Sequence, residues 1–241
     1  MSDTELPAES IRSATHRRGK VDVFDDLDPT RTALVVIDMQ NAWLAPNAPF
    51  ETAAARELIP GINRLAATLR EHGGRVIWIQ HTTGLPGSAD YWALYFDNFI
   101  KPENRAAAAA ALVPGNFMYE LAAELDVLQG DIVLPKYRFS AFARNPIDLE
   151  ARLRTLNIDS LIVTGTATNV CVESTVRDAM MRDFRVFMPR DAVAAPSRDG
   201  HLAALRNIMQ SFADVRPLES VIALIRGHQS DKASHKEAHV I

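Results

Sequence analysis

The stretch that decides the fold is Ser160-Leu-Ile-Val-Thr164, continued by Gly165-Thr-Ala-Thr-Asn-Val-Cys171-Val-Glu-Ser-Thr175. The first part is an apolar run of strand length, and the residues after Cys171 have the apolar spacing of a helix. A strand that turns sharply into a helix presents the side chains of the turn with fixed geometry. Cys171, the single cysteine in 241 residues, lies at or just inside the expected start of that helix.

Two interpretations of Cys171 are open at this point. A lone cysteine is most often a small buried apolar residue. At a helix N-terminus, however, unpaired N–H groups and the positive end of the helix dipole stabilise a thiolate. The same N–H groups can hold a developing oxyanion. Whether Cys171 is a buried core residue or a nucleophile therefore depends on which groups the rest of the chain places beside it.

Strands and helices alternate on both sides of this stretch. The apolar run 32–38, the amphipathic helix 61–72 and the strand 76–80 form a β-α-β unit, and Gly73-Gly74 end its helix. Further strands are expected at 131–135, 185–188 and 214–217, and further helices at 106–111, 147–156, after Cys171, at 199–212 and at 219–226. This alternation predicts a single-domain, doubly wound α/β fold, with a mostly parallel sheet and helices on both faces.

The two ends of the chain are polar. Residues 1–30 carry a basic patch and then an acidic one, which predicts an arm that packs on the domain or helps to form an oligomer. Residues 31–226 are the expected domain, and 227–241 a polar C-terminal tail. His235 and His239 in this tail have i,i+4 spacing but not the H-E-x-x-H order, so we expect no metal site there. The aromatic segment 82–130 is interpreted either as a lid or as a cluster covering a sheet edge or an oligomer interface.

Composition narrows the class of protein. Apolar residues make up 47% of the chain and charged residues 23%, as in a globular domain with a sizeable core. The formal net charge of −4 argues against a nucleic-acid partner. One cysteine permits no internal disulfide and fits a reducing compartment. The N-terminus lacks the pattern of a secretory signal, and no apolar run is long enough to cross a bilayer. We therefore expect a cytoplasmic protein without membrane partners.

Three chemically capable side chains follow expected strand ends: Asp38, Lys136 and Cys171. Each has a plainer explanation, as a helix cap, a solvated loop charge and a core residue. The carboxyl ends of parallel strands meet at one edge of the sheet, however, where ligands bind in such folds. A carboxylate can take the proton of a thiol and return it to a leaving amine, and an ammonium stabilises the thiolate. Together they predict amide or ureide hydrolysis through a thioester, without a metal or other cofactor.

Three segments carry a family resemblance: Leu34-Val-Val-Ile-Asp38-Met-Gln40-Asn41, Leu134-Pro-Lys136 with Ser140-Ala-Phe142, and Thr164 to Thr175. In these segments the chain resembles the isochorismatase-like cysteine hydrolases. The resemblance implies that Asp38, Lys136 and Cys171 form a catalytic triad. It also implies a cis peptide between Thr166 and Ala167, and an oxyanion hole made by the N–H groups of Ala167 and Cys171.

The resemblance also narrows the reaction. Nicotinamidases carry metal-binding histidines in the loop after the first helix, and residues 44–60 contain no histidine, so we expect no catalytic metal. True isochorismatases generally lack the cysteine. The motifs resemble most those of ureidoacrylate and carbamoyl amidohydrolases, enzymes that hydrolyse linear amides. The family commonly forms oligomers, so a homodimer or homotetramer is expected. From their positions beside the triad segments, the candidate substrate contacts are Trp43, His81, Tyr137 and Phe142.

Two alternatives remain open. An isochorismatase-type vinyl-ether hydrolase needs only Asp38 as an acid, so its activity would survive Cys171→Ala. A non-catalytic binding protein on the same fold would show ordinary thiol reactivity at Cys171. His81 likewise has two interpretations: it follows the strand 76–80 and is expected to face the same crevice as the triad, either as a substrate contact or as a simple loop residue.

Overall fold

The apolar run at Thr32–Ile37 forms the central strand, β1, in which every residue is buried. β1 lies parallel between β2 (Arg75–His81) and β4 (Ser160–Thr166). The computed structural model describes residues 6–143 and 148–237, with the side chains of the last helix described as far as residue 228. The other strands are β3 (Ile132–Lys136), β5 (Arg185–Pro189), β6 (Val193–Ala194) and β7 (Asp214–Arg216).

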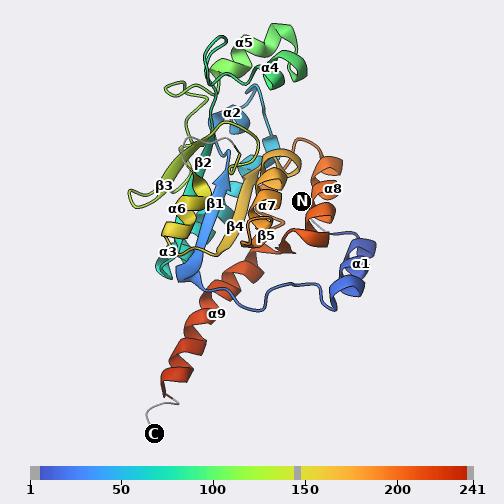
Figure 1. Ribbon diagram of the computed structural model, residues 1–241, viewed down its shortest axis with the longest axis vertical. Helices are drawn as coiled ribbons and strands as arrows, with labels where there is room; N and C mark the ends of the chain where they lie inside the picture. Colours follow the sequence, from blue (N-terminus) through green and yellow to red (C-terminus); the bar gives the residue numbers. More distant parts are fainter. Residues whose placement is uncertain (1–5, 144–147, 238–241) are drawn as a thin grey trace.

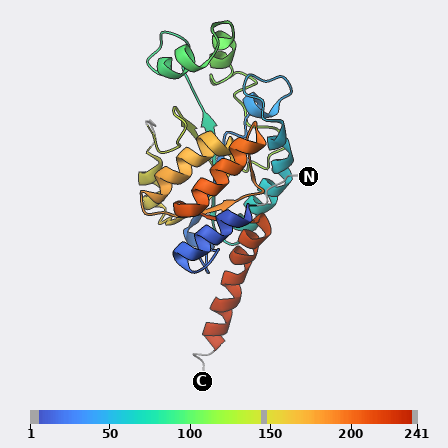
Figure 2. The ribbon, with the colours of Figure 1, turned by 90° about the vertical axis from the view of Figure 1, so that its right-hand side faces the viewer.

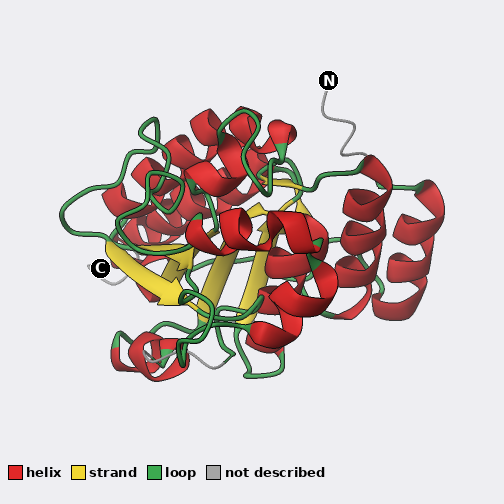
Figure 3. Ribbon diagram, turned by 90° about the horizontal axis from the view of Figure 1, so that it is seen from above, coloured by secondary structure: helices red, strands yellow, loops and turns green. Residues whose placement is uncertain are grey.

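The sheet has the order β3-β2-β1-β4-β5-β7, with β6 beside β4, and all its pairs are parallel. Side chains alternate between the two faces of each strand. Leu34 and Val36 pack in a core with α3 (Ile59–Glu71) and α9 (Leu218–Glu237). The alternate residues of β1 pack in a second core with α6 (Leu149–Thr155), α7 (Glu173–Met180) and α8 (Arg198–Ser211). Viewed from above, the strands lie between helices (Figure 3), which confirms the predicted doubly wound α/β fold.

The chain ends are more helical than their composition suggested. Helix α1 (Ala8–Arg18) lies against α8 (Figure 2), where Arg17 Nη1 donates to Ser211 Oγ at 3.0 Å. Helix α9 was expected to end at residue 226 but continues to Glu237, away from the sheet (Figure 1). His235 therefore lies within α9, and His239 lies outside the described residues. The division into arm, domain and tail stays a prediction.

Three short elements were not predicted: α2 (Asn41–Leu44), α4 (Ala93–Phe99) and β6. Each is too short for apolar periodicity to reveal it. The alanine run forms the end of a longer helix, α5 (Pro102–Ala110). Short 3₁₀ helices at Pro29–Arg31 and Ala53–Leu58 precede β1 and α3. Within the described ranges, none of the helices combines the length and apolarity that a membrane crossing requires.

Gly165 allows β4 to approach β1 where both strands end. Its φ is +104°, a conformation that favours glycine. A Cβ at this position would lie 2.1 Å from the backbone oxygen of Ile37. The close approach brings the residue after β1 next to the turn after β4, which is where Asp38 and Cys171 are found.

Candidate active site

Asp38 directly follows β1, and the chain turns there. Its φ is +52°, in the left-handed region that Asp tolerates better than most residues. The Asp38 N–H donates to the Ile79 carbonyl oxygen at 3.0 Å, which holds the turn against β2. The side chain is fully buried. Burial raises the pKa of the Asp38 carboxyl above its usual value, and the neighbouring Lys136 charge opposes that rise without cancelling it. A carboxylate with a raised pKa is a stronger base for a thiol proton.

Lys136 is the last residue of β3 and pairs in register with His81 of β2. Its side chain has no exposed surface, and its Nζ lies 2.9 Å from Asp38 Oδ2. The same nitrogen lies 3.0 Å from His81 Nδ1 and 3.4 Å from Cys171 Sγ. A fourth acceptor is the carbonyl oxygen of Arg138, at 3.2 Å. Lys136 therefore connects the carboxylate, the imidazole and the thiol.

Cys171 lies in a single π-helical turn, Thr168–Val172 (η3), between β4 and α7. The side chain is buried, and only 3% of the residue is exposed. Burial, followed by the Asp38 charge, raises the pKa of the Cys171 thiol, and Lys136 opposes this rise. The resting group is therefore a thiol. The thiolate expected from a helix start is not favoured, because burial and the Asp38 charge together outweigh the effect of the Lys136 ammonium. For Cys171 to act as a nucleophile a base would have to remove its proton, and Asp38 is placed to act as one.

The turn around Cys171 is held from both sides. The Thr175 hydroxyl donates to the Cys171 carbonyl oxygen at 2.8 Å and accepts from the Ala141 N–H at 3.1 Å. Thr168 Oγ1 lies 2.9 Å from Nδ1 of the buried His201 on α8. The peptide bond between Thr166 and Ala167 is cis. These contacts fix the backbone from which the nucleophile projects.

Asp38, His81 and Cys171 offer ligand-type atoms that all lie within 4.8 Å of one another. Such a trio has the chemistry to hold a metal ion. The Lys136 Nζ, however, lies within hydrogen-bonding distance of one atom of each, at 2.9, 3.0 and 3.4 Å. The cationic position among the three side chains is therefore taken by the ammonium, and a metal ion would have to displace it.

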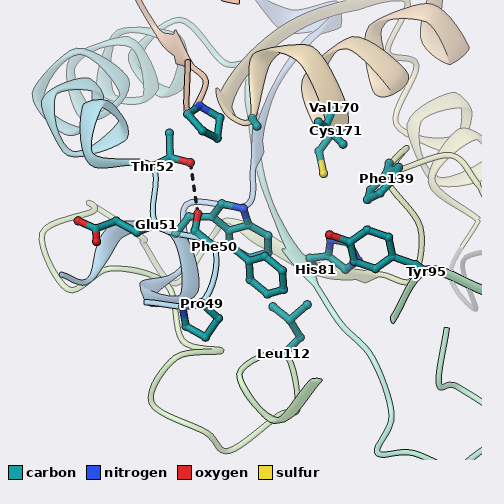
Figure 4. Close-up of a pocket in the computed structure, with 13 residues that line it drawn as sticks. Pro49, Phe50, Glu51, Thr52, His81, Tyr95, Leu112, Phe139, Val170 and Cys171 are labelled. Atoms are coloured by element: carbon teal, nitrogen blue, oxygen red, sulfur yellow. Dashed lines mark hydrogen bonds between the residues drawn. The ribbon is translucent and has the colours of Figure 1, made fainter. Parts of the chain in front are cut away.

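The triad opens into a cavity of about 310 Å³, within the size range of small-molecule sites. Figure 4 shows the Cys171 sulfur directed toward the space between Phe50, His81 and Phe139. The aromatic walls are Trp43, Phe50, Tyr95 and Phe139, and Ala167 lies beside the cysteine. The site is thus a narrow aromatic pocket with the nucleophile on one wall.

Two of the four predicted substrate contacts line this cavity. Trp43 and His81 do so, whereas Tyr137 and Phe142 do not. Phe142 packs instead against Phe184, with their ring centroids 6.0 Å apart. Phe139 holds the wall position that we expected for Tyr137. Sequence spacing could not tell which side chains of this segment line the cavity, because the chain leaves strand geometry directly after Lys136.

The aromatic segment 82–130 contributes one wall of the cavity, and no residue of this segment was named from the sequence as a cavity residue. Tyr95 of α4 lines the cavity, and its ring centroid lies 5.2 Å from that of Phe139. The ring centroid of Trp92 lies 4.8 Å from that of the same Phe139. Helices α4 and α5 lie together beyond the carboxyl edge of the sheet (Figure 1). The cluster of aromatic letters at 91–99 was the available signal.

Comparison with known proteins shows which family has this sequence and fold. The isochorismatase domain family matches residues 32–220. The chain belongs to the isochorismatase family. It is 37% identical over 208 residues to ureidoacrylate amidohydrolase RutB of Klebsiella pneumoniae, a match that covers 80% of this chain and 86% of that relative. The corresponding protein of Cronobacter sakazakii is 36% identical over 207 residues, with 80% and 87% covered.

Solved structures of the isochorismatase type share the fold. A cysteine hydrolase from Pseudomonas syringae pv. phaseolicola superposes with a TM-score of 0.77 at 26% identity, covering 86% of this chain and 98% of that one. N-carbamoylsarcosine amidase from Thermoplasma acidophilum has a TM-score of 0.62 at 24% identity, with 78% and 96% covered, and bears on the fold alone. In this isochorismatase-family chain, Asp38, Lys136 and Cys171 are clustered at the carboxyl edge of the sheet.

Proposed function

We propose that this enzyme, an amidohydrolase on the isochorismatase fold, cleaves a small ureido, carbamoyl or amide substrate by metal-independent cysteine catalysis. The observation that carries the proposal is the position of the Lys136 Nζ, 2.9 Å from Asp38 Oδ2 and 3.4 Å from Cys171 Sγ. A base, a cation and a nucleophile thus meet at one wall of an aromatic pocket. The relatives named ureidoacrylate amidohydrolase support the same class of reaction.

The first half of the reaction forms a thioester. Asp38 takes the thiol proton as Cys171 Sγ attacks the substrate carbonyl carbon, and Lys136 stabilises the negative charge on sulfur. The carbonyl oxygen becomes an oxyanion, for which the N–H groups of Ala167 and Cys171 are the proposed donors. The C–N bond then breaks, and protonated Asp38 gives its proton to the leaving nitrogen. The products of this half are ammonia or an amine and an acyl enzyme.

The second half releases the acid. Asp38, again a carboxylate, takes a proton from a water molecule that attacks the thioester carbonyl. The C–S bond breaks, and the proton held by Asp38 returns to sulfur, which restores the resting thiol. The raised pKa of Asp38 suits it to both directions of proton transfer. A carbamoyl enzyme would release carbamate, which decomposes in solution to carbon dioxide and ammonia.

The pocket indicates a small substrate with a flat or apolar portion. Trp43 stacks with Phe50, with ring centroids 5.3 Å apart, and the Phe139 ring lies edge-on to His81 at 6.3 Å. Such walls bind planar conjugated groups well. An unsaturated ureido acid, the type of compound named in the relatives, fits both this description and the cavity size.

The cellular setting and the assembly belong to the same proposal. A single free cysteine suits a reducing compartment, and the proposed location is the cytoplasm. Leu94 and Phe99 of α4 are 70% and 74% exposed, and they are candidate contacts between copies in a homodimer or homotetramer. Light scattering of the eluting protein, compared with a Leu94→Lys/Phe99→Lys variant, tests the assembly. An unchanged molecular mass in the variant would show that α4 does not form the contact between copies.

The function is tested by ammonia release from ureido acids, carbamoyl amides and simple primary amides, with Cys171→Ala as the matched inactive variant. Turnover by the native chain and its loss in Cys171→Ala are expected. Trapping an acyl enzyme on Cys171 by mass spectrometry would identify the intermediate. Activity that survives in Cys171→Ala, on amides or on vinyl ethers, would overturn the cysteine mechanism.

A further inference from the structure

His81 is held in one orientation between the triad and the cavity. Its backbone N–H donates to Gln40 Oε1 at 2.7 Å, and its carbonyl oxygen accepts from Gln40 Nε2 at 3.2 Å. Its ring stacks on Trp43 with an interplanar angle of 20°, and the centroids are 5.9 Å apart. The side chain is only 4% exposed, yet it lines the cavity. The imidazole therefore has little freedom to turn over.

The neighbour of its Nδ1 determines where the imidazole proton lies. The Lys136 Nζ is 3.0 Å from Nδ1. A lysine ammonium donates hydrogens and accepts none, so the bond between them requires an unprotonated Nδ1. Asp38 Oδ2 lies farther away, at 3.9 Å, beyond hydrogen-bonding distance. The ring proton of neutral His81 consequently belongs on Nε2.

The charge state of His81 agrees with this geometry. Burial, and after it the charges of Lys136 and Arg138, hold the pKa of His81 well below its usual range. The titratable and charged groups around the ring are Asp38, Lys136, Arg138 and Cys171, and the two cations among them disfavour a third positive charge. The pKa shift and the hydrogen-bond geometry both favour the neutral imidazole. Within the described ranges, Nε2 has no hydrogen-bond partner.

We infer that Lys136 locks His81 in the Nε2–H tautomer, and that this N–H selects substrates carrying a hydrogen-bond acceptor beside the scissile amide. The inference rests on the proposed function for its substrate. A donor on the cavity wall loses its contact with water when a ligand binds, which disfavours a ligand that cannot accept its hydrogen. The acceptor is a second carbonyl or a carboxylate, because both present oxygen lone pairs and the two cations near the ring favour negative charge. His81 is thus a specificity-determining residue, and Lys136 has a second task besides stabilising the thiolate.

The first test reads the tautomer directly and needs no substrate. Protein with ¹⁵N-labelled histidine is examined by ¹H–¹⁵N correlation between pH 5.5 and 8, with His81→Asn to assign the signal. An unprotonated Nδ1 and a protonated Nε2 that do not titrate are expected. His72 is an internal reference of the opposite kind, because its Nδ1 lies 2.8 Å from the Thr68 carbonyl oxygen and must carry a proton. A proton on Nδ1 of His81 would overturn the inference.

The second test separates the two nitrogens by mutation. In His81→Gln the longer amide can reach the position of Nε2 and still donate, whereas in His81→Asn the amide reaches only the position of Nδ1. The probes are N-carbamoylglycine, whose carboxylate is a hydrogen-bond acceptor beside the urea group, and N-propylurea, which has no acceptor besides the urea group itself. For N-carbamoylglycine, His81→Asn is expected to lower kcat/KM about ten- to a hundredfold, mainly through KM, and His81→Gln to recover part of that loss. N-propylurea should respond little to either change, and His72→Asn should leave both probes unaffected.

The outcomes separate this inference from the proposed function. Equal losses for both probes in His81→Asn would make His81 a structural residue and refute the selection. If neither probe nor any other amide is hydrolysed but the Nε2–H signal is present, the tautomer lock stands and the proposed function has failed. If both probes are hydrolysed but Nδ1 carries the proton, the proposed function stands and the tautomer lock has failed.

Discussion

Removing the ammonium of Lys136 should destabilise the fold in a way that depends on pH. Lys136→Met keeps most of the side-chain volume but breaks an ion pair of 2.9 Å between two fully buried side chains. Asp38 is then a buried carboxylate without its counter-charge. Burial already raises the pKa of Asp38 while Lys136 is present, so without it the folded protein should bind a proton there at neutral pH.

The size of the effect follows from that proton. An unfolded aspartate has a pKa of about 3.9, and each pH unit above it adds about 1.4 kcal/mol to the free energy of protonating the group. At pH 7 the cost is about 4 kcal/mol, which matches the range of about 3–5 kcal/mol for breaking a buried pair. At pH 5 it falls to about 1.5 kcal/mol. The sign is fixed, because the folded variant binds one proton more than its unfolded chain, so its relative stability rises as the pH falls.

Urea unfolding followed by tryptophan fluorescence at pH 5, 6 and 7 gives the difference in free energy of unfolding between Lys136→Met and the native chain. The double variant Asp38→Asn/Lys136→Met has no carboxylate to protonate and should lose the pH dependence. Lys20→Met is the matched control, because Lys20 pairs with Asp25 at the surface and its loss should have little effect. A small, pH-independent cost in Lys136→Met would refute the reasoning about the buried pair.

Three further results are expected. Gly165→Ala should lower the free energy of unfolding, measured by urea titration, by at least about 2 kcal/mol. The φ of Gly165 is +104°, and the new Cβ would lie 2.1 Å from the Ile37 carbonyl oxygen. Unchanged stability would contradict this expectation. The acid limb of kcat/KM should lie above the usual aspartate pKa of about 3.9, because the base Asp38 has a raised pKa and is protonated at a higher pH. In steady-state assays Phe139→Ala should raise KM and Tyr137→Ala should not, since only Phe139 lines the cavity; the reverse order would place the substrate elsewhere.

The sequence was sufficient to predict the fold class and the three triad positions. Apolar runs of strand length alternate with helical patterns, and this order leaves few topologies open. Asp38, Lys136 and Cys171 each follow such a run, and the carboxyl ends of parallel strands meet at one edge. Local patterns thus contained the information, although Lys136 and Cys171 are 35 positions apart in the chain.

Other features could not be predicted because they depend on what packs together. The wall residue is Phe139 and not Tyr137, because the chain leaves the strand after Lys136 and no periodicity applies there. Tyr95 reaches the cavity from an insertion, where its ring packs against that of Phe139, a contact between segments far apart in the sequence. Helix α9 passes the expected end at residue 226, since polar composition does not by itself end a helix.

By itself, the sequence determined which groups are candidates to react, because residue type and position after a strand are local properties. The tertiary structure alone decided their protonation. Burial keeps Cys171 a thiol and raises the pKa of Asp38, and a lysine from another strand fixes the proton of His81 on Nε2. Proton positions follow desolvation and the charges within a few ångströms, and these distances exist only once the strands are side by side.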